Sequence, residues 1–236
     1  MDKGKKRKIN VAFTLGKGAQ VIDVAGPWEV FQDVNIDNCC PFDLYTVAAE
    51  KSLIAMSGGL QVLPNFAVAD APQPDIILSP AHTNCVAINN WIRAVSGKTT
   101  IVSAVCTGVY NLAEAGLLDG LLVTTYYRSF DSLQAKFALV NVHRGLRFVD
   151  QGKVITAGGL TSCIDMSLYI VQRFFGTQVA ENTAQALEYE GSGWRCNNGL
   201  KQSARERRRG SGNLAMPNKS GAAGCQCKAG KTVSPV

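Results

Sequence analysis

Residues 101–108 constrain the fold of this chain more than any other stretch. Residues 101–105 form a short apolar run rich in β-branched side chains, Cys106-Thr107-Gly108 follows directly, and a helix-like segment begins at Val109. Such a run is typical of a buried parallel strand, and a helix that starts at once leaves only a sharp turn between the two elements. The pattern therefore predicts that Cys106 lies on a strand-to-helix turn.

A cysteine in that position is a candidate nucleophile. Backbone N–H groups at a helix N-terminus lower the pKa of a thiol and favour the thiolate, so we expect a lowered pKa for Cys106. The arrangement parallels the nucleophile elbow of serine hydrolases, with cysteine in place of serine and Ala104 in place of the first glycine. The alternative is that Cys106 is an ordinary buried core cysteine.

Strand-like and helix-like segments alternate along the chain. This alternation predicts an α/β fold with a mostly parallel sheet and helices on both faces, whose ligand site lies beyond the carboxyl ends of the strands. The predicted strands are 8–15, 42–49, 75–79 and 101–105, with small hairpins at 53–63 and around 150–152, and the predicted helices are 84–96, 109–115, 128–137, 161–175 and 178–189.

Three segments resemble the DJ-1/PfpI (class I glutamine amidotransferase-like) superfamily, in its isonitrile hydratase-like branch. Residues 106–120 with Thr124-Thr125 are similar to its nucleophile segment, residues 21–31 to its first loop and helix, and residues 156–166 to a late strand-to-helix segment. The segments are in family order at family spacing, and the resemblance covers roughly residues 8–190. It implies a flavodoxin-like sandwich with a nucleophile elbow.

The basic charge is concentrated at the two ends of the chain. Residues 1–8 carry five basic and one acidic side chain and residues 195–236 carry nine and one, so that the chain's net charge of +6 leaves −6 for residues 9–194. We expect a basic flexible N-terminus at 1–7, a DJ-1/PfpI-like domain at 8–191 and a basic disordered tail at 192–236. The tail lacks the interleaved aromatic residues of a nucleic-acid platform, so nucleic acid is not an expected partner.

The composition suits a cytoplasmic globular protein. No apolar run reaches a membrane-spanning length, and the first residues lack the apolar segment of a secretory signal. Eight cysteines at irregular spacing do not suggest a disulfide framework, so reduced thiols are expected. No metal or other cofactor is expected either, because Cys39-Cys40 are adjacent and Cys225-Gln226-Cys227 has the wrong spacing for a zinc knuckle.

The resemblance implies partners for the cysteine. Asp23 matches the acid beside the nucleophile in the hydratase branch, where burial and like charge raise the pKa of a carboxyl group and let it act as general acid and then base. The alternative is that Asp23 caps a helix opened by Gly26-Pro27. The elbow residues Thr107 and Gly108 are expected to contact substrate, with the N–H of Thr107 binding a developing anion.

The chain departs from the family pattern at two places. Pro80-Ala81-His82 stands where the family usually has Pro-Gly-Gly, so the second anion-binding donor would come from around Ala81, with His82 as a candidate lining residue. Tyr126 stands where many members have histidine, so a Cys–His pair cannot form there. Trp28 and Tyr126 are expected to line the substrate pocket.

These residues predict a cysteine-dependent hydratase, a lyase that converts a small isonitrile to an N-substituted formamide. The reaction would pass through a thioimidate on Cys106, with Asp23 as acid and base. A non-enzymatic ligand or redox sensor of the same fold and a glyoxalase- or deglycase-type enzyme are the alternatives, and Tyr126 argues against the last. The family also implies a homodimer with a small-molecule substrate and no membrane partner.

Overall fold

The computed structural model describes residues 7–195. Its helices are α1 (Val21–Gln32), α2 (Val86–Ser96), α3 (Val109–Glu114), α4 (Phe130–Lys136), α5 (Ser162–Phe175) and α6 (Thr177–Ala186). Its main strands are β1 (Ile9–Leu15), β2 (Phe42–Ala48), β5 (Phe66–Ala67), β6 (Ile76–Ser79), β7 (Ile101–Val105), β10 (Phe148–Asp150) and β11 (Val154–Ala157). Two short pairs, β3 (Ile54–Ala55) with β4 (Gln61–Val62) and β8 (Leu122–Val123) with β9 (Asn141–Val142), lie outside the main sheet.

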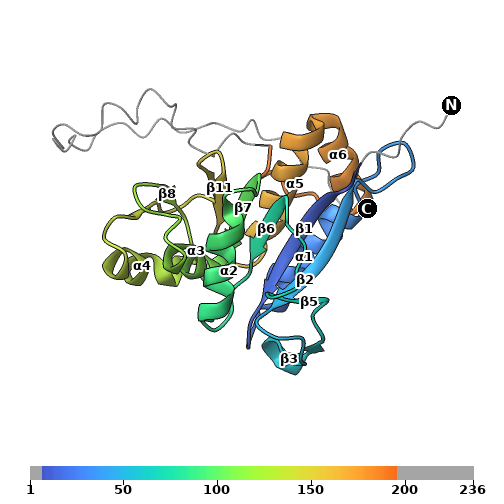
Figure 1. The fold of residues 1–236 in the computed structure, drawn as a ribbon. Coiled ribbons are helices and arrows are strands. Elements are labelled where there is room, and N and C mark those ends of the chain that lie inside the picture. The colour runs from blue at the N-terminus through green and yellow to red at the C-terminus, as the bar shows by residue number, and fades with distance from the viewer. Residues whose placement is uncertain (1–6, 196–236) are drawn as a thin grey trace, which may run out of the picture. The chain divides into compact units, whose positions relative to one another are not determined.

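The main strands form one sheet, which has seven strands within the described residues, in the order β10-β11-β7-β6-β1-β2-β5 (Figure 1). All neighbours pair in parallel except β10 and β11, which form an antiparallel hairpin. This is the mostly parallel, flavodoxin-like α/β sheet that the alternation of segments predicts.

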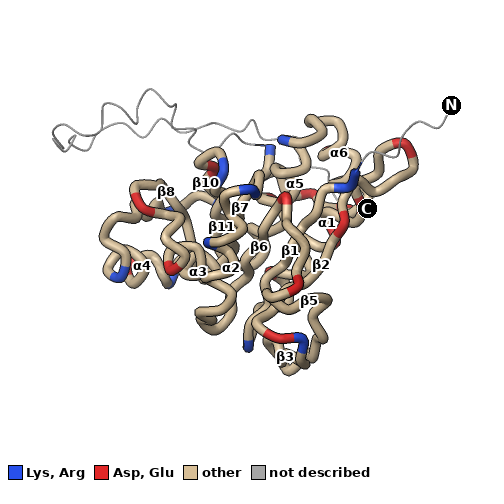
Figure 2. Tube along the Cα trace, viewed as in Figure 1, with Lys and Arg blue, Asp and Glu red and all other residues tan. Residues whose placement is uncertain are grey.

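Helices cover both faces of the sheet because side chains of a strand alternate between its faces. In β1, Val11 and Phe13 pack into a core shared with α1, α5 and α6, whereas Ala12 packs into a second core shared with α2 and α3. The centres of β1, β6, β7 and β11 carry no charged residue, and charges gather at loops and helix surfaces (Figure 2).

The carboxyl ends of four neighbouring strands meet at one edge of the sheet. The register pairs Phe13 of β1 with Leu78 of β6, and Val105 of β7 with Ala157 of β11. The residues that follow these strands are Gly16, Pro80, Cys106 and Gly158. The topology therefore brings sequence-distant loops around the cysteine.

One predicted helix start is corrected by the structure. Helix α1 begins at Val21, so Pro27 lies inside it and does not open it. Pro27 removes only its own N–H, the donor that Asp23 O would otherwise receive, and the helix continues through it.

The packed domain extends beyond both ends of the predicted 8–191 range. Arg7 forms two hydrogen bonds to the carboxylate of Asp75, at 2.8 and 2.9 Å. Trp194 is 1% exposed and belongs to the core with α5 and α6, so tertiary burial overrides the polar composition of its neighbours. Residues 1–6 and 196–236 of the predicted flexible ends lie outside the described residues. Within residues 7–195, no helix is long and apolar enough to cross a membrane.

Candidate functional site

Cys106 lies on a strained turn between β7 and α3. Its φ angle is +56°, a left-handed conformation that is uncommon for a residue with a side chain and is found at nucleophile elbows. Its N–H donates to Gly158 O at 2.9 Å, and Thr125 Oγ1 donates to Cys106 O at 2.7 Å. These bonds anchor the peptide groups before and after Cys106. The strained turn is therefore held by Gly158, directly after β11, and by Thr125, in the loop before α4.

Gly108 allows this turn to pack against the loop after β6. A Cβ on Gly108 would lie 2.1 Å from Ser79 O and 2.6 Å from Pro80 O. The close approach requires glycine. The structure therefore gives Gly108 a packing role at the elbow.

Asp23 lies in the first turn of α1 and is completely buried. Its Oδ2 accepts a hydrogen bond from Ala81 N–H at 3.2 Å, and its Oδ1 has no hydrogen-bond partner among the described residues. Burial raises the pKa of Asp23 to about 6, and the bond from Ala81 partly opposes the rise. Asp23 therefore has one anchored oxygen and one oxygen able to exchange a proton.

The expectation of a lowered thiol pKa is wrong. Burial, followed by the negative charge of Asp23, raises the pKa of Cys106 to about 11, although the N–H groups of Thr107 and Leu160 act in the opposite direction. Cys106 is only 7% exposed, so loss of hydration outweighs the helix N-terminus. At neutral pH the two groups are therefore a neutral thiol and a nearby carboxylate.

The hydrogen-bond donors to the sulfur come from two loops. Thr107 N–H, as predicted for the elbow, and Leu160 N–H both face Cys106. The N–H of Ala81, expected to bind an anion, donates to Asp23 instead. The sequence analysis did not identify Leu160 as a site residue. The feature that could have indicated it is the preceding pair Gly158-Gly159, which allows a tight turn. Leu160 itself has a φ of +47°.

His82 is held by protein partners behind the elbow and is not a lining residue of the cavity beside Tyr126. Its Nδ1 lies 2.8 Å from Thr83 O and its Nε2 lies 3.0 Å from Asn111 Nδ2, which assigns the proton of the neutral ring to Nδ1. Burial lowers the pKa of His82 and so favours this neutral form. Gly16 makes room for the ring, since a Cβ there would lie 2.4 Å from Nδ1.

Tyr126 lines a cavity of about 520 Å³ beside the cysteine. Cys106 itself is not a lining residue, but Leu160 and Thr125, which both bond to the cysteine, are. A Cβ on Gly159 would lie 2.7 Å from the Tyr126 ring, so this glycine lets the ring pack against the loop. The cavity is the candidate substrate site.

Trp28 lies away from that cavity, contrary to the expectation. Its ring packs against Phe13 with centroids 5.1 Å apart, and it lines a separate pocket of about 180 Å³ with Met56 and Leu60. Trp28 belongs to α1 five residues after Asp23, more than one helical turn away, which directs it to another part of the surface.

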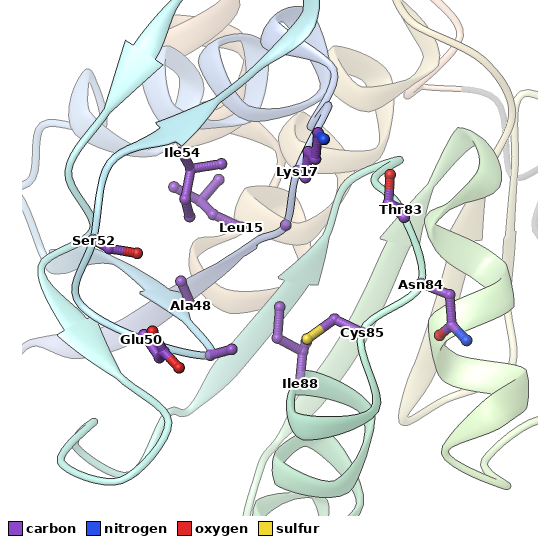
Figure 3. Close-up of a pocket in the computed structure, with 12 residues that line it drawn as sticks. Leu15, Lys17, Ala48, Glu50, Ser52, Ile54, Thr83, Asn84, Cys85 and Ile88 are labelled. Atoms are coloured by element: carbon purple, nitrogen blue, oxygen red, sulfur yellow. The ribbon is translucent and has the colours of Figure 1, made fainter.

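Another cavity, of about 290 Å³, lies at the carboxyl ends of β1 and β2. Figure 3 shows Cys85 and Ile88 on one side of it and Ala48, Glu50 and Ser52 on the other. None of the predicted site residues lines it. Among residues 7–195 there is no group of three or more His, Cys, Asp or Glu side chains that could hold a metal ion.

Comparisons with known proteins agree with this geometry. The chain is 28% identical over 187 residues to isonitrile hydratase of Pseudomonas putida, covering 77% of this chain and 78% of that protein. It is 25% identical to the HTH-type transcriptional regulator CdhR of Pseudomonas aeruginosa over 73% of this chain, but spans only 53% of that regulator.

The fold matches the crystal structure of a ThiJ/PfpI family protein from Pseudomonas syringae with a TM-score of 0.70, at 22% identity, covering 78% of this chain and 76% of that one. The model of the DJ-1/PfpI family matches residues 9–173, from β1 through most of α5. The chain therefore belongs to the DJ-1/PfpI family.

Proposed function

We propose that this protein is a cysteine-dependent hydratase that converts an isonitrile to an N-substituted formamide. The observation that carries the proposal is the pairing of a buried thiol on a strained elbow with a buried carboxylate whose Oδ1 is unpartnered. The similarity to isonitrile hydratase supports this choice of reaction.

The first step adds the thiol across the isonitrile carbon. Oδ1 of Asp23 takes the proton from Cys106 and delivers it to the terminal carbon, while the sulfur forms a bond to the same carbon. The product is a thioimidate, R–N=CH–S–Cys106, with no atom lost. Moving the proton through Asp23 avoids a free thiolate, which a thiol pKa of about 11 makes rare at neutral pH.

Water completes the reaction. Asp23 removes a proton from water as the oxygen attacks the thioimidate carbon, and passes this proton to the imine nitrogen, which becomes N–H. The C–S bond then breaks as the hydroxyl of the adduct becomes the carbonyl of the formamide R–NH–CHO, and the hydroxyl proton passes to the Cys106 sulfur. The N–H groups of Thr107 and Leu160 hydrogen-bond the sulfur as its charge changes in both steps.

The test is formamide production from benzyl isonitrile and cyclohexyl isonitrile, followed by chromatography. Wild-type protein is expected to turn over at least one of them, and Cys106→Ala and Asp23→Asn are each expected to reduce turnover by 100-fold or more. Cys85→Ala is the matched control, because Cys85 lines the other cavity. A folded wild type without formamide production overturns the proposal.

The second candidate function is a small-molecule or redox sensor of the same fold. It is favoured by the similarity to transcriptional regulators. A sensor would be modified at Cys106 by hydrogen peroxide, or bind a ligand, without turnover. Mass spectrometry of peroxide-treated protein, combined with the turnover assay above, distinguishes the two functions.

We also propose that the protein acts as a homodimer in the reducing cytoplasm, where Cys106 stays a thiol. Three leucines flank the β3–β4 hairpin with exposed fractions of 51–65%: Leu53, Leu60 and Leu63. Leu60 lines a pocket with Trp28 of α1, so a second copy of the chain is the partner that this apolar face suits. Sedimentation of wild type and Leu60→Glu tests the dimer.

A further inference from the structure

The cavity beside Cys106 combines aromatic walls with one fixed cation. Tyr126, Tyr127 and Phe130 contribute rings to its lining. Arg147 is the one charged side chain that lines it within the described residues, and no carboxylate does so. At about 520 Å³ the cavity is in the size range of small-molecule sites and holds more than the reacting group of a substrate.

The guanidinium of Arg147 is held in place but remains accessible. Its Nε donates to Asp165 Oδ2 at 2.6 Å and its Nη2 lies 2.5 Å from the same oxygen, while Nη1 and Nη2 lie 3.4 Å from Thr161 Oγ1. Asp165 is 1% exposed, whereas the Arg147 side chain is 41% exposed. A buried carboxylate thus orients a partly exposed guanidinium that lines the cavity, and a guanidinium is suited to binding planar anions.

The rim of the cavity adds positive charge. The guanidinium of Arg128 lies 5.5 Å from the centroid of the Tyr127 ring and that of Arg144 lies 5.2 Å from the centroid of Phe130. Arg144 pairs with the exposed Asp131, and Arg128 has no carboxylate partner among the described residues. Three arginines against two carboxylates leave the mouth net positive, which attracts anions.

We propose that the substrate attacked by Cys106 carries a carboxylate on an aromatic or apolar body, and that Arg147 binds this carboxylate. The inference rests on the proposed hydratase function and specifies its substrate class. The rings of Tyr126, Tyr127 and Phe130 pack against the body of the substrate, while its reacting carbon lies toward Leu160 and the cysteine. Arg128 and Arg144 draw the anion toward the mouth.

The experiment compares two substrates that differ in charge at one position, 4-(isocyanomethyl)benzoate and its methyl ester. Wild type is expected to have a kcat/KM at least 10-fold higher for the carboxylate, mostly through KM, with the ratio falling as salt is added. The double variant Arg147→Gln/Asp165→Asn is expected to bring the ratio near one. This double change avoids leaving Asp165 as a buried, unpaired charge.

Two controls keep the result specific. Lys98→Gln removes a cation from the loop after α2, away from the cavity lining, and is expected to leave the ratio unchanged. Arg128→Gln changes only the exposed rim and is expected to reduce the ratio by about 2- to 3-fold, even if the double variant fails to fold.

The outcomes separate this inference from the proposed function. Turnover of both substrates at equal efficiency in wild type overturns the inference and leaves the hydratase. If neither isonitrile is hydrated, the hydratase proposal fails, and calorimetric binding of 4-methylbenzoate against 4-methylbenzamide decides the inference. Preference for the benzoate, lost in the double variant, supports a carboxylate site; equal binding or none overturns it.

Discussion

Asp23 accepts the backbone N–H of Ala81 through Oδ2 at 3.2 Å, and its other oxygen has no partner among the described residues. A buried carboxylate in this state has lost its hydration, and one hydrogen bond offsets that loss only in part, so the pKa of Asp23 rises to about 6. The charge of Asp23 in turn raises the pKa of the nearby Cys106 thiol. At neutral pH the site therefore holds a carboxylate near a neutral thiol.

We predict that hydratase activity has an acid limb with a midpoint near pH 6. Below that pH the Asp23 carboxylate is protonated while the Cys106 thiol also keeps its proton, so no base remains to take the thiol proton. The measurement is kcat/KM for an isonitrile between pH 4.5 and 9. A profile that stays level from pH 5 to 8 contradicts the role of Asp23 as the base.

We predict that Asp23→Asn stabilises the folded protein at neutral pH while it abolishes activity. The folded pKa of about 6 lies above the ordinary value of 3.8, so the folded state binds the proton more tightly and ionisation of Asp23 costs stability as pH rises from about 4 to 6. Two pKa units correspond to about 3 kcal/mol at pH 7, as an upper value.

Urea unfolding at pH 7.5 and pH 4.5 measures this effect. The gain from Asp23→Asn is expected at pH 7.5 and should be much smaller at pH 4.5, where the wild-type carboxyl is protonated in the folded state and ionised only in the unfolded chain. Asp33→Asn, at the exposed end of α1, is the control and should change stability little at either pH. A variant less stable than wild type at pH 7.5 would refute this account of the buried charge.

The sequence was sufficient to predict the elbow and the sheet. The β7 run, the Cys106 turn and the start of α3 are local patterns, and alternating strands and helices force the carboxyl ends of the strands to one edge. Asp23 was found only through the family resemblance, because no local pattern marks residue 23 as a neighbour of residue 106.

Contacts between distant loops and the degree of burial could not be predicted in this way. Leu160 faces the sulfur and Ala81 faces Asp23 because of how four loops pack at the sheet edge. The direction of the Cys106 pKa depended on burial, which a sequence pattern of helix and turn does not contain. Trp28 was misplaced for a similar reason, since the side of α1 that faces the cysteine is set by tertiary packing.

We predict that Gly159→Ala impairs the active site while the fold persists. The new Cβ would lie 2.7 Å from the Tyr126 ring, so the ring or the loop must move and carry the Leu160 N–H away from Cys106. Losing one donor should raise the pKa of the thiol further and lower kcat/KM about 10-fold or more.

The pH dependence of alkylation by iodoacetamide measures the thiol pKa in this variant. Gly97→Ala is the matched control, because no atom lies within 4 Å of a Cβ at that position, at the end of α2. Adding Tyr126→Leu to Gly159→Ala should restore part of the activity by relieving the contact. Unchanged alkylation and turnover in Gly159→Ala would show that Leu160 does not assist the sulfur.

We predict that His82 stabilises the fold above pH 6.5 and that this contribution is lost in acid. Burial depresses its folded pKa below the ordinary value of 6.5, so the unfolded chain takes up a proton first and stability falls as pH drops from 6.5 through the folded pKa. Protonation turns Nε2 from an acceptor into a donor, which opposes the N–H of Asn111 at 3.0 Å.

Protonation of Asp23 stabilises the folded protein, whereas protonation of His82 destabilises it, and the two pH ranges overlap. The two effects on stability must therefore be separated. The comparison is therefore Asp23→Asn against Asp23→Asn/His82→Gln, by urea unfolding from pH 5 to 8. The single variant should lose stability relative to the double variant as pH falls below 6.5, since glutamine does not titrate. Parallel curves would mean that His82 keeps its ordinary protonation behaviour and does not hold the loop after β6 to α3 through a neutral ring.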